Sequence, residues 1–236
     1  MRFKNIYKLF REQTAKNGGE AVFYSRRRSE PTAVAGGLTS NNWSSINWED
    51  FESQVHDFAC ALLAKGLTRG ASVAILAGNI PEWTIIDIAT IAAGGVGVGI
   101  YPTSSAEQCE YIINHSDAEF VFVDSQFQLE KITDIGDPLP KLREIICLEE
   151  TEDFSFEAVS KYDKGRFLGF GSSIEIKEVP ITIYKDFLEF GRQNREEFLP
   201  KVEEIGLNAK PEDIAIMVYT SGTTGKPKGA MLSHQY

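Results

Sequence analysis

The sequence predicts an α/β fold in which parallel sheet strands are covered by helices on both faces. Between residues 72 and 123, short strand-like runs alternate with helix-like segments, and the runs are apolar throughout. Strands that are apolar on both faces are typical of a parallel sheet buried between two helical layers. The chain has 236 residues, of which 42% are hydrophobic, so it is long enough for a buried core of domain size.

The first expected element is an amphipathic helix within the first 30 residues. Phe3, Ile6, Tyr7 and Phe10 recur at spacings of three and four residues, which places them on one helical face. The stretch from Arg26 to Ser45 mixes Pro, Gly, Ser and Asn without periodicity. We therefore expect a surface loop or a loose hairpin there.

A second helix is expected from Trp48, with apolar residues at helical spacing up to Leu62. Asn47 is suited to cap its start, and Gly66 is suited to end it. His56 lies inside this helix without a second ligand-type residue at a matching offset. It is therefore predicted to be a structural or surface histidine rather than a metal ligand.

The central part of the chain repeats the order strand, turn, helix. Pro81 fits the first position of one helix, and Ser104 or Ser105 can cap the start of the next helix. The expected elements are the strand Ser72–Leu76, the helix Glu82–Ala93, the strand Val96–Ile100, the helix Ala106–Asn114 and the strand Phe120–Val123. Each crossover between parallel strands should be right-handed.

The glycines between Gly94 and Gly99 do not form the GxGxxG pattern, so a dinucleotide site of the Rossmann type is not supported. We expect them instead to let a helix end and a strand pack closely.

Past Asp124 the periodicity weakens. The expected elements there are a helix around Gln126–Ile135, a strand at Ile145–Leu148, an irregular or β-like region at Arg166–Pro180, a helix at Thr182–Arg195, a polar stretch at Pro200–Asp213 and a buried strand at Ile214–Tyr219.

Two charged runs could suggest ligand sites, but both are better explained as solvated. Three adjacent arginines, Arg26 to Arg28, cannot all face one phosphate, so a solvated strand end is favoured. An acidic run could bind a cation only with ordered carboxylate geometry, and such a run on a loop is usually solvated. Its members are Glu149, Glu150, Glu152, Asp153 and Glu157. No metal site is assigned.

Composition excludes several classes of protein. The net charge of -10 and the pI of about 4.9 argue against nucleic-acid binding, which needs Lys and Arg to neutralise phosphates. Three cysteines without CxxC spacing suggest neither a disulfide framework nor a zinc site, and fit a reducing cytoplasm. Met1 to Phe10 does not have the form of a secretory signal. The most apolar segment, Ile85 to Ile100, is shorter than the roughly 20 residues of a membrane-spanning helix.

The segment that carries chemistry follows the last expected strand and reads YTSGTTGKPKGA, from Tyr219 to Ala230. Glycines at 222, 225 and 229 permit unusual backbone angles and close approach of N–H groups to an anion. Four hydroxyls add neutral donors, and Lys226 and Lys228 add charge. We predict a phosphate-binding loop. A plain glycine-rich hairpin turn is the alternative, but a turn needs only one or two such residues.

The spacing of this loop does not match GxxxxGK followed by Ser or Thr. Counting from Gly222, Pro227 occupies the place of the second glycine, and counting from Gly225, Ala230 occupies it. A kinase or GTPase of the P-loop type is therefore disfavoured.

The segment YTSGTTGKPKGAMLSH resembles the signature loop of the adenylate-forming superfamily, which contains acyl-CoA synthetases, peptide-synthetase adenylation domains and luciferases. In that family the loop closes over the β- and γ-phosphates of ATP. The resemblance implies this role for Thr220, Ser221, Gly222, Thr223, Thr224, Gly225 and Lys228. Lys226 falls at a variable position, and His234 matches a histidine to which we assign no catalytic role. No catalytic residue is assigned in this chain.

Segments upstream of the loop are similar to the long-chain acyl-CoA synthetase branch. They are Gly78–Trp83, Gly97–Ser105, Tyr111–Ser116 and the insertion that contains Tyr184–Gly191. The resemblance implies activation of a fatty acid by Mg-ATP to an acyl-adenylate, followed by transfer to CoA. Because the family's adenine and magnesium motif, its ribose-binding Asp and its C-terminal domain with a catalytic Lys are not in the sequence, we interpret residues 1–236 as an incomplete N-terminal domain of the adenylate-forming fold. Most of the Mg²⁺ and CoA sites would then lie outside it.

Three alternatives remain open. The chain represents a fatty acid CoA ligase whose activity belongs to a longer polypeptide, or it is a catalytically silent fragment that at most binds nucleotide weakly. A peptide-synthetase adenylation domain is a rival that fits the insertion less well. The lipid substrate favours peripheral contact of a cytoplasmic protein with a membrane, for which Phe3 to Phe10 is a weak candidate anchor. Acyl chain length and oligomeric state are not indicated by the sequence.

Overall fold

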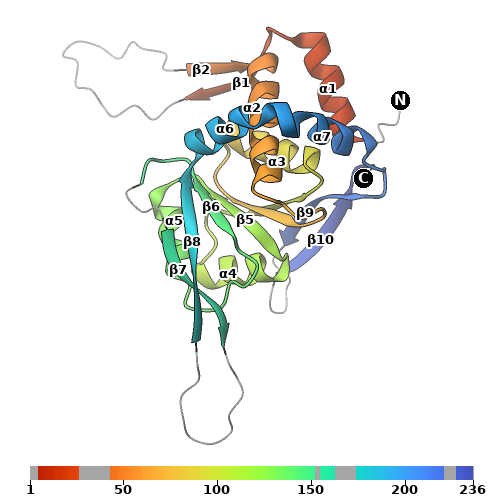
Figure 1. Cartoon of the computed structure of the whole chain (residues 1–236). Coiled ribbons are helices and arrows are strands. Elements are labelled where there is room, and N and C mark those ends of the chain that lie inside the picture. The colour runs from red at the N-terminus through yellow and green to blue at the C-terminus, as the bar shows by residue number, and fades with distance from the viewer. Residues whose placement is uncertain (1–4, 27–42, 152–154, 163–173, 221–226, 236) are drawn as a thin grey trace, which may run out of the picture.

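The computed structural model describes residues 5–26, 43–151, 155–162, 174–220 and 227–235 (Figure 1). Its helices are α1 (Ile6–Asn17), α2 (Trp48–Ala64), α3 (Pro81–Ala92), α4 (Ala106–His115), α5 (Gln126–Thr133), α6 (Tyr184–Gln193) and α7 (Arg195–Asn208). Its strands are β1 (Ala21–Arg26), β2 (Trp43–Asn47), β3 (Ser72–Leu76), β4 (Val96–Ile100), β5 (Ala118–Val123), β6 (Glu144–Cys147), β7 (Ser155–Tyr162), β8 (Ile174–Ile183), β9 (Ile214–Thr220) and β10 (Lys228–Ser233).

The main sheet has eight strands in the order β10-β9-β4-β3-β5-β6-β8-β7. From β9 to β8 all neighbours are parallel, whereas the two outermost strands, β10 and β7, pair antiparallel with theirs. The expected α/β class with a parallel sheet is therefore confirmed, and the sheet is mixed because hairpins form both of its edges. Strands β1 and β2 form a separate antiparallel ribbon.

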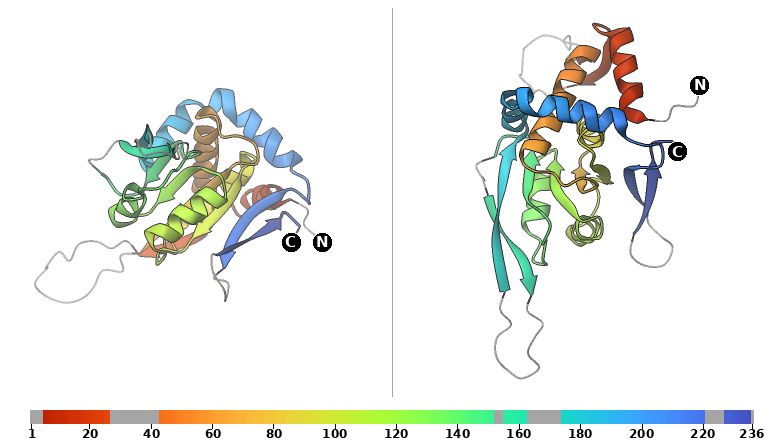
Figure 2. Two further views of the ribbon diagram at one scale, coloured as in Figure 1. Left: turned by 90° about the horizontal axis from the view of Figure 1, so that it is seen from below. Right: turned by 45° about the vertical axis from the view of Figure 1, so that its right-hand side comes forward.

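Helices cover both faces of this sheet, as the apolar strands predicted (Figure 2). Alternate residues of β5 enter two different hydrophobic clusters: Phe120 and Phe122 pack under α2, α3 and α6, and Val121 and Val123 pack under α4 and α5. Successive side chains of a strand point to opposite faces, so a strand buried on both sides must be apolar throughout.

Helix boundaries are set largely by the residues expected to set them. The Asn47 side chain accepts a hydrogen bond of 2.7 Å from the backbone N–H of Asp50, which caps α2, and Gly66 follows that helix with a φ of +80°. Ser105 caps α4 in a reciprocal capping box with Gln108. Such caps satisfy amide groups that have no partner inside the helix.

The glycines before and within β4 allow α3 to lie against the sheet. A Cβ at Gly95 would lie 3.0 Å from the carbonyl oxygen of Ala71, and a Cβ at Gly97 would collide with Oδ1 of Asp87. Close packing of a helix and a strand is therefore the role of these glycines, as expected.

The stretch from Arg26 to Ser45 is framed by the β1–β2 ribbon, in which Arg26 pairs with Trp43. This agrees with a loose hairpin. Residues 27–42, which include Arg27 and Arg28, lie outside the described residues, so the prediction for the arginine run is not tested.

The expectation for residues 200–213 was wrong in part, because helix α7 continues through Pro200 to Asn208. Val202 of α7 is fully buried, and Asn5 donates hydrogen bonds of 2.9 Å to the carbonyls of Gly206 and Ala209. Tertiary packing thus overrides the weak local signal of a polar segment with a proline.

An ion-pair cluster around one buried carboxylate joins α2 to helices α6 and α7. Asp57 is fully buried, and its carboxylate accepts from Arg195 at 2.5 Å and from Arg192 at 3.4 Å. Gly191 lies so close to the carbonyl oxygen of Asp57 that no side chain would fit at that position. A buried carboxylate that stays charged requires such paired partners, so this cluster fixes where α6 ends and α7 begins.

Candidate functional site

The segment predicted to bind phosphate leaves the carboxyl edge of the parallel sheet. Thr220 is the last residue of β9 and Lys228 is the first residue of β10, and they are paired across the hairpin. Ligands of open α/β sheets bind outside the carboxyl ends of the parallel strands. The two described residues of the predicted set are therefore brought together at the edge where a ligand is expected. Ser221, Gly222, Thr223, Thr224, Gly225 and Lys226 lie outside the described residues.

Both Thr220 and Lys228 are exposed. No carboxylate of the described residues lies within ion-pair distance of Lys228. An ammonium group that has no counter-ion among the described residues and lies next to a hydroxyl is chemically suited to an anionic ligand.

The sequence interpretation of Gly229 has to be corrected. We expected this glycine to let backbone N–H groups approach an anion, but it lies inside strand β10 and pairs with Tyr219. A Cβ at this position would lie 3.1 Å from Cζ of Tyr219 and 3.1 Å from Sδ of Met217. Gly229 therefore makes room for the Tyr219 ring. The segment from Lys228 to Ala230, which was expected to be loop, is likewise strand.

Tyr219 is held in place from the other side as well. Its hydroxyl and Nδ1 of His115 are hydrogen-bonded at 2.7 Å, and the two rings meet edge to face with centroids 5.7 Å apart. Burial raises the pKa of Tyr219 to about 12, with nearby Tyr111 acting in the same direction, so the hydroxyl is protonated at neutral pH. This contact was not foreseen, because His115 and Tyr219 are far apart in the sequence.

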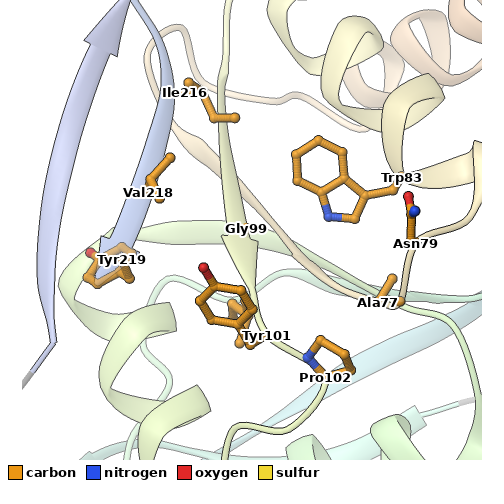
Figure 3. Close-up of a pocket in the computed structure, with 11 residues that line it drawn as sticks. Ala77, Asn79, Trp83, Gly99, Tyr101, Pro102, Ile216, Val218 and Tyr219 are labelled. Atoms are coloured by element: carbon orange, nitrogen blue, oxygen red, sulfur yellow. The ribbon is translucent and has the colours of Figure 1, made fainter. Parts of the chain in front are cut away.

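Next to the hairpin lies a cavity of about 370 Å³ (Figure 3). Its lining comes from strands β4 and β9, from the residues that follow β3 and β4, and from one side chain of α3. The lining residues are Ala77, Gly78, Asn79, Trp83, Gly99, Ile100, Tyr101, Pro102, Ile216, Val218 and Tyr219. Figure 3 shows Trp83 on one side of Gly99 and the β9 residues Ile216 and Val218 on the other. A Cβ at Gly99 would lie 3.3 Å from the Trp83 ring, so a side chain there would narrow the cavity.

The unit formed by β5 and α5 anchors two loops at the rim of this cavity. Oδ2 of Asp124 accepts a hydrogen bond of 2.7 Å from the backbone N–H of Gly78. The carbonyl oxygen of Pro102 accepts from Nζ of Lys131 at 2.8 Å and from Nε2 of Gln128 at 3.1 Å. Side-chain hydrogen bonds of this kind fix loop backbones that have no ladder partner.

The three histidines occupy different environments. His56 is buried and bonded at 2.9 Å to the Tyr7 hydroxyl, which agrees with its predicted structural role. His234 is buried at the amino edge of the sheet, where its Nδ1 accepts from the backbone N–H of Ile6 at 3.2 Å. It thus joins two distant parts of the chain. His115, for which no role was predicted, is the histidine that contacts the base of the predicted loop.

Other expectations concern metals, thiols and membranes. Among the described residues there is no group of three or more His, Cys, Asp or Glu side chains that could hold a metal ion. In the acidic run, Glu149 accepts from the backbone N–H of Gln126 at 2.9 Å, at the start of α5, whereas Glu152 and Asp153 lie outside the described residues. The cysteines are Cys60, Cys109 and Cys147, which are free and buried. No helix in the described part of the chain is long and apolar enough to cross a membrane.

Trp83 and Tyr101 lie inside two of the upstream motifs, but neither was predicted to belong to a binding site. The available signal was positional: each lies just after a predicted parallel strand or in the helix that follows it, and these loops meet at one edge.

Comparisons with known proteins agree with this geometry. The model of the family described as "AMP-binding enzyme" matches residues 11–236. A long-chain-fatty-acid–CoA ligase, ACSBG2, from Xenopus laevis is 31% identical over 97% of this chain and 26% of its own length. ACSBG1 from Homo sapiens, also named a long-chain-fatty-acid–CoA ligase, is 34% identical over 82% of this chain and 23% of its own length. The chain thus spans about a quarter of the length of these curated relatives.

Solved structures show the same fold at lower identity. The anthranilate CoA ligase AuaEII, in complex with anthranoyl-AMP, superposes with a TM-score of 0.69 at 19% identity over 100% of this chain and 36% of that chain. A fatty acyl CoA synthetase from Mycobacterium tuberculosis superposes with a TM-score of 0.64 at 16% identity over 98% of this chain and 35% of that chain.

Proposed function

We propose a function from one premise: this chain belongs to the AMP-binding enzyme family. It supplies the triphosphate-binding loop of an ATP-dependent enzyme that converts a long-chain fatty acid to an acyl-adenylate and then to acyl-CoA. The observation that carries the proposal is the pairing of Thr220 with Lys228 at the carboxyl edge of the sheet, on either side of Ser221–Lys226.

In the first step, the fatty carboxylate attacks the α-phosphorus of ATP, an acyl–phosphate bond forms, and the bond to pyrophosphate breaks. Negative charge grows on the leaving pyrophosphate. The ammonium of Lys228 would hold that group and stabilise its charge, together with hydroxyls and N–H groups of residues 220–225. Positioning and charge neutralisation dominate such substitutions at phosphorus. In the second step the CoA thiol attacks the acyl carbon and AMP leaves.

The cavity beside the hairpin fits an uncharged part of a substrate better than a phosphate. Trp83, Ile216 and Val218 line it with apolar surface, while Asn79 and Tyr101 offer polar groups at its edge. Small-molecule pockets commonly combine apolar walls with a few such polar groups. Its position next to Tyr219 places it on the same edge as the proposed phosphate site.

The remaining parts of the proposal concern cofactors and location. Mg²⁺ would accompany ATP and neutralise its phosphates, but we assign it no protein ligand in the described residues. The free, buried cysteines support a reducing cytoplasm. A peripheral contact with a membrane would bring the enzyme to a lipid-borne substrate.

The test compares Lys228→Met with Lys228→Arg and with the control Lys210→Met. Lys210 is exposed at the opposite edge of the sheet, before β9. Removing a charged donor to phosphate should weaken ATP and pyrophosphate binding by about 10-fold or more. Calorimetry should show this loss for Lys228→Met, partial retention for Lys228→Arg and no change for Lys210→Met.

Two results would count against the proposal. Equal pyrophosphate affinity of Lys228→Met and the unaltered protein would remove Lys228 from the site. ATP binding without fatty-acid-dependent exchange of pyrophosphate into ATP would favour the catalytically silent, nucleotide-binding alternative.

A further inference from the structure

One side-chain contact links two segments that are separated by 104 positions in the chain. Nδ1 of His115, the last residue of α4, is hydrogen-bonded at 2.7 Å to the hydroxyl of Tyr219 near the end of β9. Tyr219 is only 3% exposed, whereas His115 lies at the surface. The contact therefore joins an accessible histidine to a buried ring at the base of the predicted phosphate loop.

The Tyr219 ring has little freedom to move. On one side it lies against Gly229 of the facing strand, where no Cβ is present to push it away. On the other side it meets the His115 ring edge to face. An aromatic ring packed over a cross-strand glycine restrains the local register of two strands.

The residues that flank this ring are the two described members of the candidate site. Thr220 follows Tyr219 directly, and Lys228 directly precedes Gly229. A shift of Tyr219 relative to Gly229 would therefore carry Thr220 and Lys228 with it, because these are their direct chain neighbours and are themselves paired across the two strands. Small displacements of ligand-binding groups have large effects on affinity.

We propose that His115 is a positioning residue for phosphate binding: through the Tyr219 hydroxyl it holds Thr220 and Lys228, the two described residues of the proposed phosphate site, in place. His115 itself touches no substrate. This inference rests on the proposed function of the loop and adds a residue from another part of the chain to it.

The experiment uses a double-mutant cycle with His115→Phe, Tyr219→Phe and the two changes combined. Each replacement keeps a ring and removes one partner of the hydrogen bond. Tyr24→Phe is the matched control, because Tyr24 is 69% exposed on the outlying β1–β2 ribbon. Affinities for pyrophosphate, ATP and AMP are measured by calorimetry, and thermal midpoints are recorded for every variant.

We expect each single variant to bind pyrophosphate and ATP about fivefold more weakly, the effect of losing one hydrogen bond. The combined variant should be no weaker than Tyr219→Phe alone, because both changes remove the bond to His115, and Tyr219→Phe also removes the hydrogen bond of the hydroxyl with Ser116. Affinity for AMP, which lacks the β- and γ-phosphates, should not change. His115→Gln, which can still bond to the hydroxyl, should recover part of the loss.

The outcomes separate the two proposals. If the unaltered protein binds no pyrophosphate, the proposed function of the loop fails and this inference falls with it. If it binds pyrophosphate and the variants bind equally well, only the inference is overturned. It is also overturned if AMP and pyrophosphate affinities fall together, or if the two single effects add, because His115 would then act through general stability.

Discussion

A carboxylate buried beneath the candidate site should make the protein less stable as the pH rises. Asp87 of α3 faces Gly97 of β4, and its Oδ1 is buried without a hydrogen-bond partner among the described residues. Burial raises its pKa from the ordinary 3.8 to about 7. A folded-state pKa above the unfolded value stabilises the protein at low pH, and that contribution is lost as the pH rises from about 4 to about 7.

Replacing Asp87 with Asn removes the ionisable group and keeps the shape of the side chain. The difference between 3.8 and about 7 corresponds to about 4 kcal/mol if the full cost of the charge is borne by the folded state. Relaxation and entry of water reduce such costs, so we expect Asp87→Asn to be more stable than the unaltered protein by about 2 kcal/mol at pH 8.

Urea unfolding at several pH values between 4.5 and 8 provides the assay. The stability gained by Asp87→Asn should grow with pH up to about 7 and then level off, whereas Asp137→Asn, at an exposed position, should show no gain. If Asp87→Asn is no more stable than the unaltered protein, or is more stable by the same amount at every pH, the raised pKa of Asp87 is refuted.

Two further predictions concern residues outside the proposed loop. Burial, together with nearby Arg11 and Arg195, lowers the pKa of His56 to about 4, so the free energy of unfolding should fall by about 1 to 3 kcal/mol as the pH falls from about 6.5 to 4. In urea titrations, His56→Gln should make the free energy of unfolding depend less on pH over this range. An unchanged pH dependence would assign the acid sensitivity to another group. Lys131→Met removes the donor to the carbonyls of Pro102 and Ser104. Hydrogen exchange of the backbone amides at residues 101–105 should therefore become faster by about 5-fold or more, while exchange in α2 stays unchanged. Lys131→Arg, which keeps a charged donor, should show a smaller increase. Equal exchange in the variant and the unaltered protein would mean that Lys131 does not hold this loop.

The elements that could be predicted from the sequence are those whose boundaries are marked locally. Strands β3 and β4 begin and end where expected, because Gly and Pro residues bracket short apolar runs. The start of α2 is marked by the Asn47 cap in the same way. Helix α7 escaped prediction because the elements it packs on, α2 and α3, lie far away in the sequence. Strand β10 escaped it because its first residues belong to the glycine-rich motif that was interpreted as loop.

In the candidate site, too, residues marked by a local motif could be predicted, and residues brought together by the fold could not. The motif itself identified Thr220 and Lys228, and the structure places them opposite each other, while the roles of Ser221 to Gly225 stay predictions. Gly229 was misread, because a glycine needed for a neighbouring ring looks the same in sequence as one needed for an anion. His115 and the cavity wall at Trp83 become visible only when several strand ends meet in space.

The bond between His234 and Ile6 affects the order in which the chain can fold. Helix α1 is made first during synthesis, yet its first turn is held by the His234 ring and by Asn5 bonds to the end of α7, contacts that span more than 200 residues. Closing so long a loop is slow compared with forming the βα units between residues 72 and 133. Tyr7 and Phe10 can pack on α2 as soon as that helix forms, but the first turn of α1 stays without its α7 and His234 partners until those parts of the chain emerge, and during that interval it is open to chaperones.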